Sequence, residues 1–229
     1  MGRFIGTTGR KQIIVAIDGP AGAGKSTIAR SLARRLGFTY IDTGAMYRAV
    51  ALWALRAGFD LDDLHRLEQL AREARIEFDG DRVLLNGEDV TAAIREPEVT
   101  QAASKVSIAP GVRKALREEQ RRIGRLQSVV MEGRDIGTVV FPDAQVKVYL
   151  DAAPEIRAKR RALETGADIN SIAQEIAERD GRDRRRMEAP LTQAPDAEYL
   201  DSTGLSPEAV EEAILKLIRK RTSNGKEHL

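Results

Sequence analysis

Buried strands and amphipathic helices alternate along most of the chain. Residues 13–17, Ile-Ile-Val-Ala-Ile, form an unbroken apolar run, which is typical of a strand that is buried on both faces. After a Gly-rich segment, Ile28, Leu32 and Leu36 repeat at four-residue spacing, which predicts an amphipathic helix. The same order recurs downstream and predicts an α/β fold, a parallel sheet covered by helices. The expected strands are 13–17, 38–42, 128–131, 146–150 and 198–200, and the expected helices are 25–36, 45–57, 61–74, 98–107, 112–124, 154–164, 169–187 and 208–220.

One region interrupts this rhythm. Between residues 75 and 90, apolar side chains alternate with polar ones around two tight-turn dipeptides, Asp79-Gly80 and Asn86-Gly87. This pattern predicts antiparallel strands inside an otherwise parallel α/β chain. We interpret residues 61–95 as an inserted subdomain, and a surface excursion without a function is the alternative.

Composition excludes several classes of protein. The 229 residues include 37 Lys and Arg against 35 Asp and Glu, a net charge of +2, which argues against a general nucleic-acid coat. Cysteine is absent, so disulfides, thiolate metal sites and cysteine nucleophiles are excluded. His65 and His228 are the two histidines, too few for a multi-histidine metal site. No apolar run is long enough for a secretory signal or a membrane span, so we expect a cytoplasmic protein without membrane contact.

The sharpest motif is the sequence GPAGAGKS at residues 19–26, which matches the pattern G-x-x-x-x-G-K-S/T and lies between an expected strand and an expected helix. Glycines let backbone N–H groups close around a polyphosphate, and the start of the helix adds partial positive charge. Lys25 would reach the β- and γ-phosphates and the Ser26 hydroxyl would bind Mg²⁺. The residues expected to bind the nucleoside triphosphate are Gly19, Pro20, Ala21, Gly22, Ala23, Gly24, Lys25, Ser26 and Thr27.

The motif alone leaves three classes of protein open. A GTPase switch needs D-x-x-G after its second strand and N-K-x-D for guanine; residues 201–204 fit the first pattern but come far too late, and N-K-x-D is absent. A nucleic-acid motor normally needs a longer chain. A small-molecule kinase needs a second anion site that faces the first, with arginines around both phosphates.

Arginine placement favours the kinase. Arg48 lies one turn into the second expected helix, and Arg134-Asp135 follows the end of the 128–131 strand. Ligands of open parallel sheets bind beyond the carboxyl ends of the strands, so we expect Thr43 and these residues to converge there. The arginine fork suits bidentate phosphate binding.

A second arginine-rich segment covers residues 179–186. Arg179, Asp183 and Arg186 have the spacing i, i+4, i+7, which puts them on one side of a helix that could bind phosphate and sugar. A solvated helix surface and a nucleic-acid patch are the alternatives, although aromatic residues for base stacking make up only 4% of the chain.

Taken together, four segments resemble the bacterial cytidylate kinase family: GPAGAGKST (19–27), DTGAMYR (42–48), EGRDIGTVVFPDA (132–144) and RDRRRMEAPL (182–191). The resemblance extends from about residue 12 to about residue 221. It implies ATP-dependent phosphorylation of CMP and dCMP to CDP and dCDP, with Mg²⁺. It also implies a P-loop kinase fold with a five-stranded parallel sheet, an inserted NMP-binding subdomain and a mobile lid. The expected parts are a core of 12–60 and 96–221, a lid around 152–168, the subdomain at 61–95, and flexible termini at 1–11 and 222–229.

The resemblance also implies roles for individual residues. It assigns the CMP phosphate to Thr43, Arg48 and Arg134, and the cytosine edge to Ser104, Arg113 and Asp135. Sugar and phosphate contacts fall to Arg179, Asp183 and Arg186, and the lid arginines are Arg157, Arg160 and Arg161. The expected catalytic residues are Lys25, Arg134, Arg157, Arg160 and Arg161.

The expected chemistry needs no strong general base, because the acceptor phosphate is already ionised near neutral pH. Catalysis would consist of positioning and charge neutralisation, with a lid that excludes water. A kinase for another monophosphate, UMP or AMP, is the alternative enzyme, and a P-loop protein that binds RNA or DNA through residues 179–186 is the alternative outside enzymes. We expect a monomer that binds small molecules and no nucleic acid.

Overall fold

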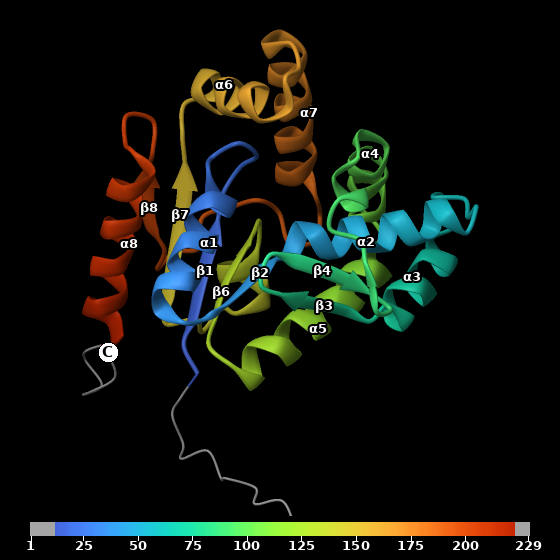
Figure 1. Cartoon of the computed structure of the whole chain (residues 1–229), viewed down its shortest axis with the longest axis horizontal. Helices are drawn as coiled ribbons and strands as arrows, with labels where there is room; N and C mark the ends of the chain where they lie inside the picture. The colour runs from blue at the N-terminus through green and yellow to red at the C-terminus, as the bar shows by residue number, and fades with distance from the viewer. Residues whose placement is uncertain (1–11, 223–229) are drawn as a thin grey trace, which may run out of the picture.

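The computed structural model describes residues 12–222. At its centre lies a five-stranded sheet of order β2-β6-β1-β7-β8, in which every pair of neighbours is parallel. Figure 1 shows the strands with helices on both faces. The strands are β1 (Ile14–Asp18), β2 (Thr39–Asp42), β6 (Val129–Gly133), β7 (Val146–Asp151) and β8 (Glu198–Asp201). The parallel α/β sheet expected from the sequence is therefore confirmed.

The apolar run in β1 serves two cores at once. Val15 and Ile17 belong to a cluster with helices α1 (Lys25–Leu36) and α8 (Pro207–Thr222) on one face of the sheet. Ile14 and Ala16 belong to the larger cluster on the other face. Successive side chains of a strand point to opposite faces, so a strand covered on both sides has no position for a polar residue before its end.

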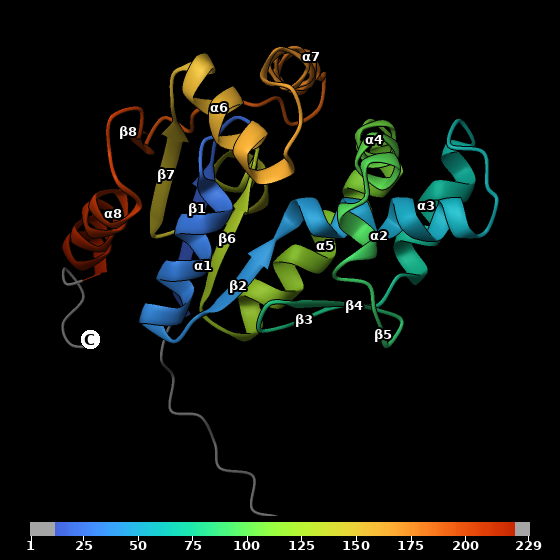
Figure 2. The same ribbon diagram turned by 45° about the horizontal axis from the view of Figure 1, so that its top comes forward.

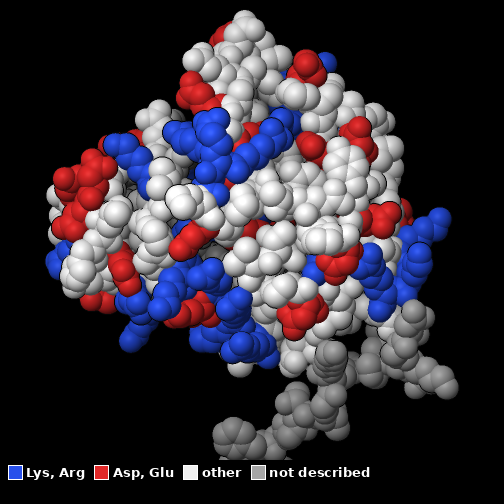
Figure 3. Space-filling view, turned by 180° about the vertical axis from the view of Figure 1, so that it is seen from behind, with Lys and Arg blue, Asp and Glu red and all other residues white. Residues whose placement is uncertain are grey.

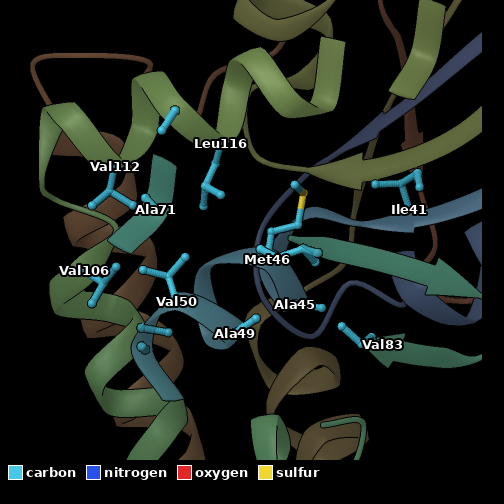
Figure 4. Packing of buried hydrophobic residues seen from close by; sticks show 14 of the residues in the cluster. Ile41, Ala45, Met46, Ala49, Val50, Ala71, Val83, Val106, Val112 and Leu116 are labelled. Atoms are coloured by element: carbon cyan, nitrogen blue, oxygen red, sulfur yellow. The ribbon is translucent and has the colours of Figure 1, made fainter. Parts of the chain in front are cut away.

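The long connection from β2 to β6 forms the larger core. Figure 4 shows Met46 and Val50 of α2 packed among side chains of the neighbouring elements, such as Leu116 of α5 and Val83 of β4. The elements of this connection are α2 (Thr43–Arg56), α3 (Leu64–Glu73), β3 (Ile76–Asp79), β4 (Arg82–Leu85), β5 (Glu88–Asp89), the short helix η1 (Ala93–Arg95), α4 (Pro97–Val106) and α5 (Pro110–Leu126).

The strands β3, β4 and β5 form the antiparallel sheet that the turn dipeptides predict. Asn86 and Gly87 have φ of 53° and 86°, the left-handed conformations of a type I′ hairpin turn. The first turn lies one residue later than expected, because Asp79 still pairs with Arg82 across the hairpin. The small sheet shares its core with α2, α4 and α5, and the limits of a subdomain at residues 61 and 95 stay a prediction.

Two helices lie over the carboxyl ends of β1 and β7. Figure 2, in which the top of the molecule comes forward, shows α6 (Pro154–Thr165) and α7 (Ile169–Arg185) at this edge. A π-helical turn, η2 (Ile136–Val140), follows β6 and was not expected from the sequence. No helix within residues 12–222 combines the length and the apolar character that a bilayer span requires. The expected flexible ends lie outside the described residues, apart from Thr222, which is the last residue of α8.

Helix starts differ from the sequence expectation by a few residues. The second helix begins at Thr43 rather than at residue 45, because the Asp42 side chain accepts a hydrogen bond from the Ala45 N–H and so caps the first turn. Asp63 caps α3 in the same way through the Arg66 N–H, and that helix therefore begins at Leu64 rather than at residue 61.

We predict that Gly124→Ala lowers the free energy of unfolding by about 1–2 kcal/mol, although alanine is the better helix former. A Cβ at Gly124 would lie 2.6 Å from Phe141 Cζ and 2.9 Å from Ile14 Cδ1, both in the packed core. The matched control is Gly181→Ala in α7, where the new Cβ would meet only the flexible end of Arg185. Urea unfolding should show the control to be neutral or stabilising, and equal effects of the two substitutions would contradict the packing argument.

Candidate active site

The glycine-rich segment forms a loop from the end of β1 to the start of α1 (Figure 1). Gly19 has φ of 147°, and a Cβ there would collide with the carbonyl oxygen of Leu150. Gly24 has φ of 91° at the start of α1. Side chains at these positions would strain the loop or displace its neighbours, so the backbone stays free to surround an anion.

Lys25 lies in the first turn of α1 and is 6% exposed. Its Nζ donates a hydrogen bond to the carbonyl oxygen of Pro20 at 2.6 Å. Burial, followed by the nearby charge of Arg134, lowers the pKa of Lys25 to about 7. The ammonium group therefore lies in a dry, cation-rich place where a bound anion would favour its charged form.

The buried carboxyl group of Glu132, near the end of β6, lies beside this loop. It accepts a hydrogen bond from the Tyr40 hydroxyl at 2.5 Å, and the Ser26 hydroxyl lies close enough to lower its pKa. Burial and the charge of Asp42 dominate, so the pKa of Glu132 is raised. Sequence reasoning missed Glu132, although a single acidic residue at the end of a buried strand is a usable signal.

Thr43 and Arg48 lie at the beginning of α2, where the sequence places them beside the phosphate loop. The Thr43 hydroxyl donates to the backbone carbonyl of Glu132 at 2.7 Å, and Arg48 forms an ion pair with Asp42 at 2.7 Å. Burial raises the pKa of Asp42, but Arg48 and the Ala45 N–H outweigh it, so the pKa is lowered. Asp42 thus holds the Arg48 guanidinium in place.

Arg113 and Asp135, expected to recognise one base, form an ion pair of 2.7 Å between α5 and the end of β6. Arg113 is 6% exposed, and its guanidinium carbon lies 5.9 Å from the centre of the Tyr47 ring. Ser104 is half-buried on α4 and connects to this pair through the backbone: its carbonyl accepts from the Ser107 hydroxyl, and the Ser107 carbonyl accepts from Arg113.

The arginine-rich end of α7 meets the end of β6. Asp183 accepts a hydrogen bond from Arg134 Nε at 2.9 Å and another from Arg186. Burial raises the pKa of Asp183, but Arg134, Arg186 and Arg179 together lower it more, so the carboxylate stays ionised. Arg134, Asp183 and Arg186 are therefore close together, although nearly 50 residues separate Arg134 from the other two.

Several cations lie near enough to Lys25 or to Arg179 to lower the pKa of that group. Burial lowers the pKa of Arg179 to about 10, with further lowering by the charges of Arg134, Arg48 and Arg161. The pKa of Lys25 responds in the same way to Arg134 and Arg179. We call this group the cation cluster; its members are Lys25, Arg48, Arg134, Arg161 and Arg179. Cations that repel one another at partly buried positions favour the binding of polyanions, because a bound anion reduces the repulsion.

The three arginines expected in the lid have three different environments on α6. Arg157 is buried and donates to Asp180 at 2.5 Å, to the Ala21 carbonyl at 2.9 Å and to the Ala152 carbonyl at 3.1 Å. Arg160 donates to the side chain and the backbone of Ser202. Arg161 is exposed and pairs with Glu164.

Asp18, the last residue of β1, is a further site residue that the sequence did not reveal. Its carboxylate is 4% exposed and accepts the N–H groups of Ile136 and Gly137 at 2.8 and 2.7 Å. Burial raises its pKa to about 6 despite these two hydrogen bonds. Asp18 thus ties the start of the phosphate loop to η2, directly after Arg134 and Asp135.

His65 is exposed on α3, and His228 lies outside the described residues. The described residues contain no group of three or more His, Asp or Glu side chains placed to hold a metal ion. Ser26 and Glu132 nevertheless offer hard oxygen donors beside the phosphate loop. This arrangement fits Mg²⁺, which keeps several waters and takes further ligands from substrate phosphates.

The fold of this chain is shared with a protein of known structure. A crystal structure of an uncharacterized protein from Eubacterium ventriosum superimposes with a TM-score of 0.55 at 14% identity, covering 92% of this chain and 100% of that one. This likeness shows the fold alone.

Sequence comparison is more specific. The family model described as cytidylate kinase matches residues 15–220. A protein named cytidylate kinase from Solibacter usitatus is 62% identical over 227 residues, covering 96% of this chain and 98% of that protein. Another of that name from Caldanaerobacter subterraneus subsp. tengcongensis is 50% identical, covering 91% of this chain and 95% of that protein. The chain therefore belongs to the cytidylate kinase family.

Proposed function

We propose that the protein transfers the γ-phosphoryl group of ATP to CMP, and to dCMP, giving CDP or dCDP and ADP. Membership of the cytidylate kinase family supports the reaction. The structural observation that carries it is the position of Arg134. Its charge lowers the pKa of Lys25 in the phosphate loop, its side chain donates to Asp183 of α7 at 2.9 Å, and the next residue, Asp135, pairs with Arg113. Such a site suits two anionic substrates whose phosphates must approach each other against their own repulsion.

ATP binds through the phosphate loop of residues 19–27. Its backbone N–H groups and the start of α1 surround the polyphosphate, and Lys25 leaves the Pro20 carbonyl to bind the β- and γ-phosphates. Ser26 and Glu132 would hold Mg²⁺, directly or through its waters. When bound, the metal neutralises charge on the β- and γ-phosphates and orients them.

CMP binds on the opposite side of the cation cluster. Thr43, Arg48 and Arg134 bind its phosphate, and Arg179, Asp183 and Arg186 bind phosphate and sugar. Cytosine presents an amino group that donates and ring atoms that accept, so it suits one carboxylate beside one guanidinium, which Asp135 and Arg113 provide. Ser104, on the adjacent turn of α4, contacts the same edge of cytosine.

Chemistry proceeds by positioning and charge neutralisation. The acceptor is an ionised phosphate oxygen, so the site needs no strong base. Lys25, Arg134 and the lid residues Arg160 and Arg161 stabilise charge on the transferred group, and closure of α6 and α7 excludes water that would hydrolyse ATP. Arg157 belongs to the same lid and contacts the phosphate loop directly.

The alternatives have less support. A preference for UMP or AMP is not favoured by the family to which the chain belongs. A protein that binds nucleic acid is expected to carry a continuous basic track. The face of the molecule that Figure 3 shows, opposite to that of Figure 1, instead carries basic side chains in several groups with acidic ones among them. We further propose that the protein is a monomer and is located in the cytoplasm. The absence of cysteine supports a cytoplasmic location, because that compartment is reducing.

We predict that Arg134→Ala lowers kcat on the order of 10³-fold and leaves the melting temperature almost unchanged, because Arg134 is the central member of the cation cluster. The control is Arg122→Ala, which removes an exposed arginine of α5 that pairs with Glu119. Coupled assays of ADP release would measure both. A wild-type rate in Arg134→Ala would remove the proposed active site.

Acceptor choice should depend on Asp135. An amide in its place cannot pair with Arg113 as an ion and presents a donor where the cytosine amino group needs an acceptor. Asp135→Asn should raise KM for CMP by about 10- to 100-fold and reduce the preference for CMP over UMP. Steady-state kinetics with CMP, dCMP, UMP, AMP and GMP would test this, and an unchanged order of preference would contradict the assignment.

Binding of ATP should take up protons at alkaline pH. With a pKa of about 7, Lys25 is mostly neutral in the free protein at pH 8, and the triphosphate favours its charged form. Calorimetric titration with MgATP at pH 8, in buffers of different ionisation enthalpy, should show uptake of about one proton. The uptake should vanish at pH 6 and in Lys25→Arg, which stays charged; no buffer dependence at pH 8 would contradict the linkage.

A further inference from the structure

The two lid helices hold one residue of the phosphate loop from both sides of its backbone. The N–H group of Ala21 donates to Asp180 Oδ1 at 3.1 Å, and the carbonyl of Ala21 accepts from Arg157 Nη1 at 2.9 Å. Arg157 Nη1 also donates to Asp180 Oδ2 at 2.5 Å. Ala21, Arg157 and Asp180 thus form a closed ring of hydrogen bonds, which we call the clasp.

The clasp is buried and packed. Arg157 is 6% exposed and Asp180 is 3% exposed. The Ala21 side chain packs against a small apolar cluster of α6 and α7, whose members are Ala158, Ile172 and Ile176. A Cβ at Gly22 would lie 2.8 Å from the Arg157 carbonyl oxygen and 3.0 Å from Arg157 Cβ, so α6 lies directly against the loop.

A buried ion pair is a poor means of stabilising a fold, because removal of its charges from water offsets most of the attraction. Apolar side chains of similar size would hold α6 against α7 at least as well. Directional hydrogen bonds do something else: they fix the position of Ala21 relative to the two helices. The clasp therefore indicates that Ala21 must have one exact position relative to α6 and α7.

What the clasp places follows from the sequence of α7. Asp180 is directly preceded by Arg179, a member of the cation cluster, and three residues later Asp183 contacts Arg134. A helix moves as a rigid unit over such a short segment. The position of Ala21 in the loop that receives the donor therefore determines where Arg179 and Asp183 stand on the acceptor side.

We propose that Arg157 and Asp180 are positioning residues that align the phosphate loop with the acceptor-binding face of α7. Neither acts on the transferred phosphoryl group, and each depends on the other. This inference rests on the proposed phosphoryl transfer and changes the role of Arg157, which the resemblance places among the catalytic residues. Misalignment of about 1 Å can cost about 10²-fold in rate, which is the scale of effect expected here.

A double-mutant cycle tests the proposal, with Asp180→Asn, Arg157→Met and both together. Each single variant should lower kcat by about 10- to 100-fold while KM for ATP and for CMP changes by less than about threefold. The double variant should be no slower than the slower single variant, because either change already opens the clasp. Glu178→Gln, which removes one exposed carboxylate from the same helix, is the control and should keep wild-type kinetics.

The outcomes separate the possible roles. Additive losses in the double variant would show that Arg157 acts on the phosphoryl group by itself, and an unchanged kcat in Asp180→Asn would show that alignment does not need the clasp. A lower melting temperature in the variants, with kcat returning to the wild-type value when they are assayed well below that temperature, would show a purely structural role. Each of these results overturns the proposal.

Two precautions keep the test decisive. Arg157→Met leaves the Asp180 carboxylate buried without a partner, so Arg157→Lys, which keeps a charge but cannot form all three contacts, replaces it if the first variant does not fold. The wild-type protein must also phosphorylate CMP. If it does not, the proposed function fails, whereas failure of the cycle in an active enzyme removes only the clasp.

Discussion

The candidate active site depends on one interaction, the electrostatic repulsion among cations that the fold holds close together. Burial, followed by the charge of Arg134, lowers the pKa values of Lys25 and Arg179. Burial also lowers the pKa of Arg134, but the charges of Asp183, Asp180 and Glu132 outweigh it, so the pKa of Arg134 is raised. Asp183 neutralises part of this charge by accepting hydrogen bonds from Arg134 and Arg186. In the proposed function, substrate phosphates neutralise the rest, so the binding of two anions removes repulsion that the free protein carries in its folded state. In this way the energy of binding is concentrated where the phosphates meet.

The architecture explains how such a cluster can exist. Apolar packing on both faces of the sheet fixes the ends of β1 and β6, and Asp18 then joins the two ends through η2. Cations that lie just beyond the ends of different strands are therefore held close together by the rigid sheet, in spite of their electrostatic repulsion. In the proposed function, α6 and α7 form the movable part. They contact the rest of the protein through Arg157 and Asp180 at the phosphate loop, through Arg160 at Ser202 and through Asp183 at Arg134.

Sequence patterns predicted the features that are local. The loop between a strand and a helix at residues 19–24, the double-sided burial of β1 and the Asn86-Gly87 turn each depend on a few neighbouring residues, and the structure confirms all three. The family was predicted as well, since four long segments resemble it, and the family model confirms it. The roles given to single residues stay predictions that the proposed experiments test.

Features that depend on distant partners escaped prediction. The resemblance grouped Arg157 with Arg160 and Arg161, but the contacts of Arg157 with Ala21 and Asp180 join residues 136 and 23 positions away. Asp18 and Glu132 are single acidic residues at strand ends, and only the sheet order, which places β1 beside β6, brings both to the same edge of the sheet. The π-helical turn η2 likewise begins with two N–H groups, of Ile136 and Gly137, that donate to the distant Asp18 carboxylate, which no local pattern reveals.

The most direct measurement is a crystal structure of the protein with adenosine and cytidine joined through a chain of phosphates. The account predicts that the phosphate chain runs from the loop of residues 19–27 into the cation cluster, with cytosine against Arg113 and Asp135. A cytidine bound elsewhere, with Arg134 and Arg179 turned to solvent and free of phosphate, would contradict it.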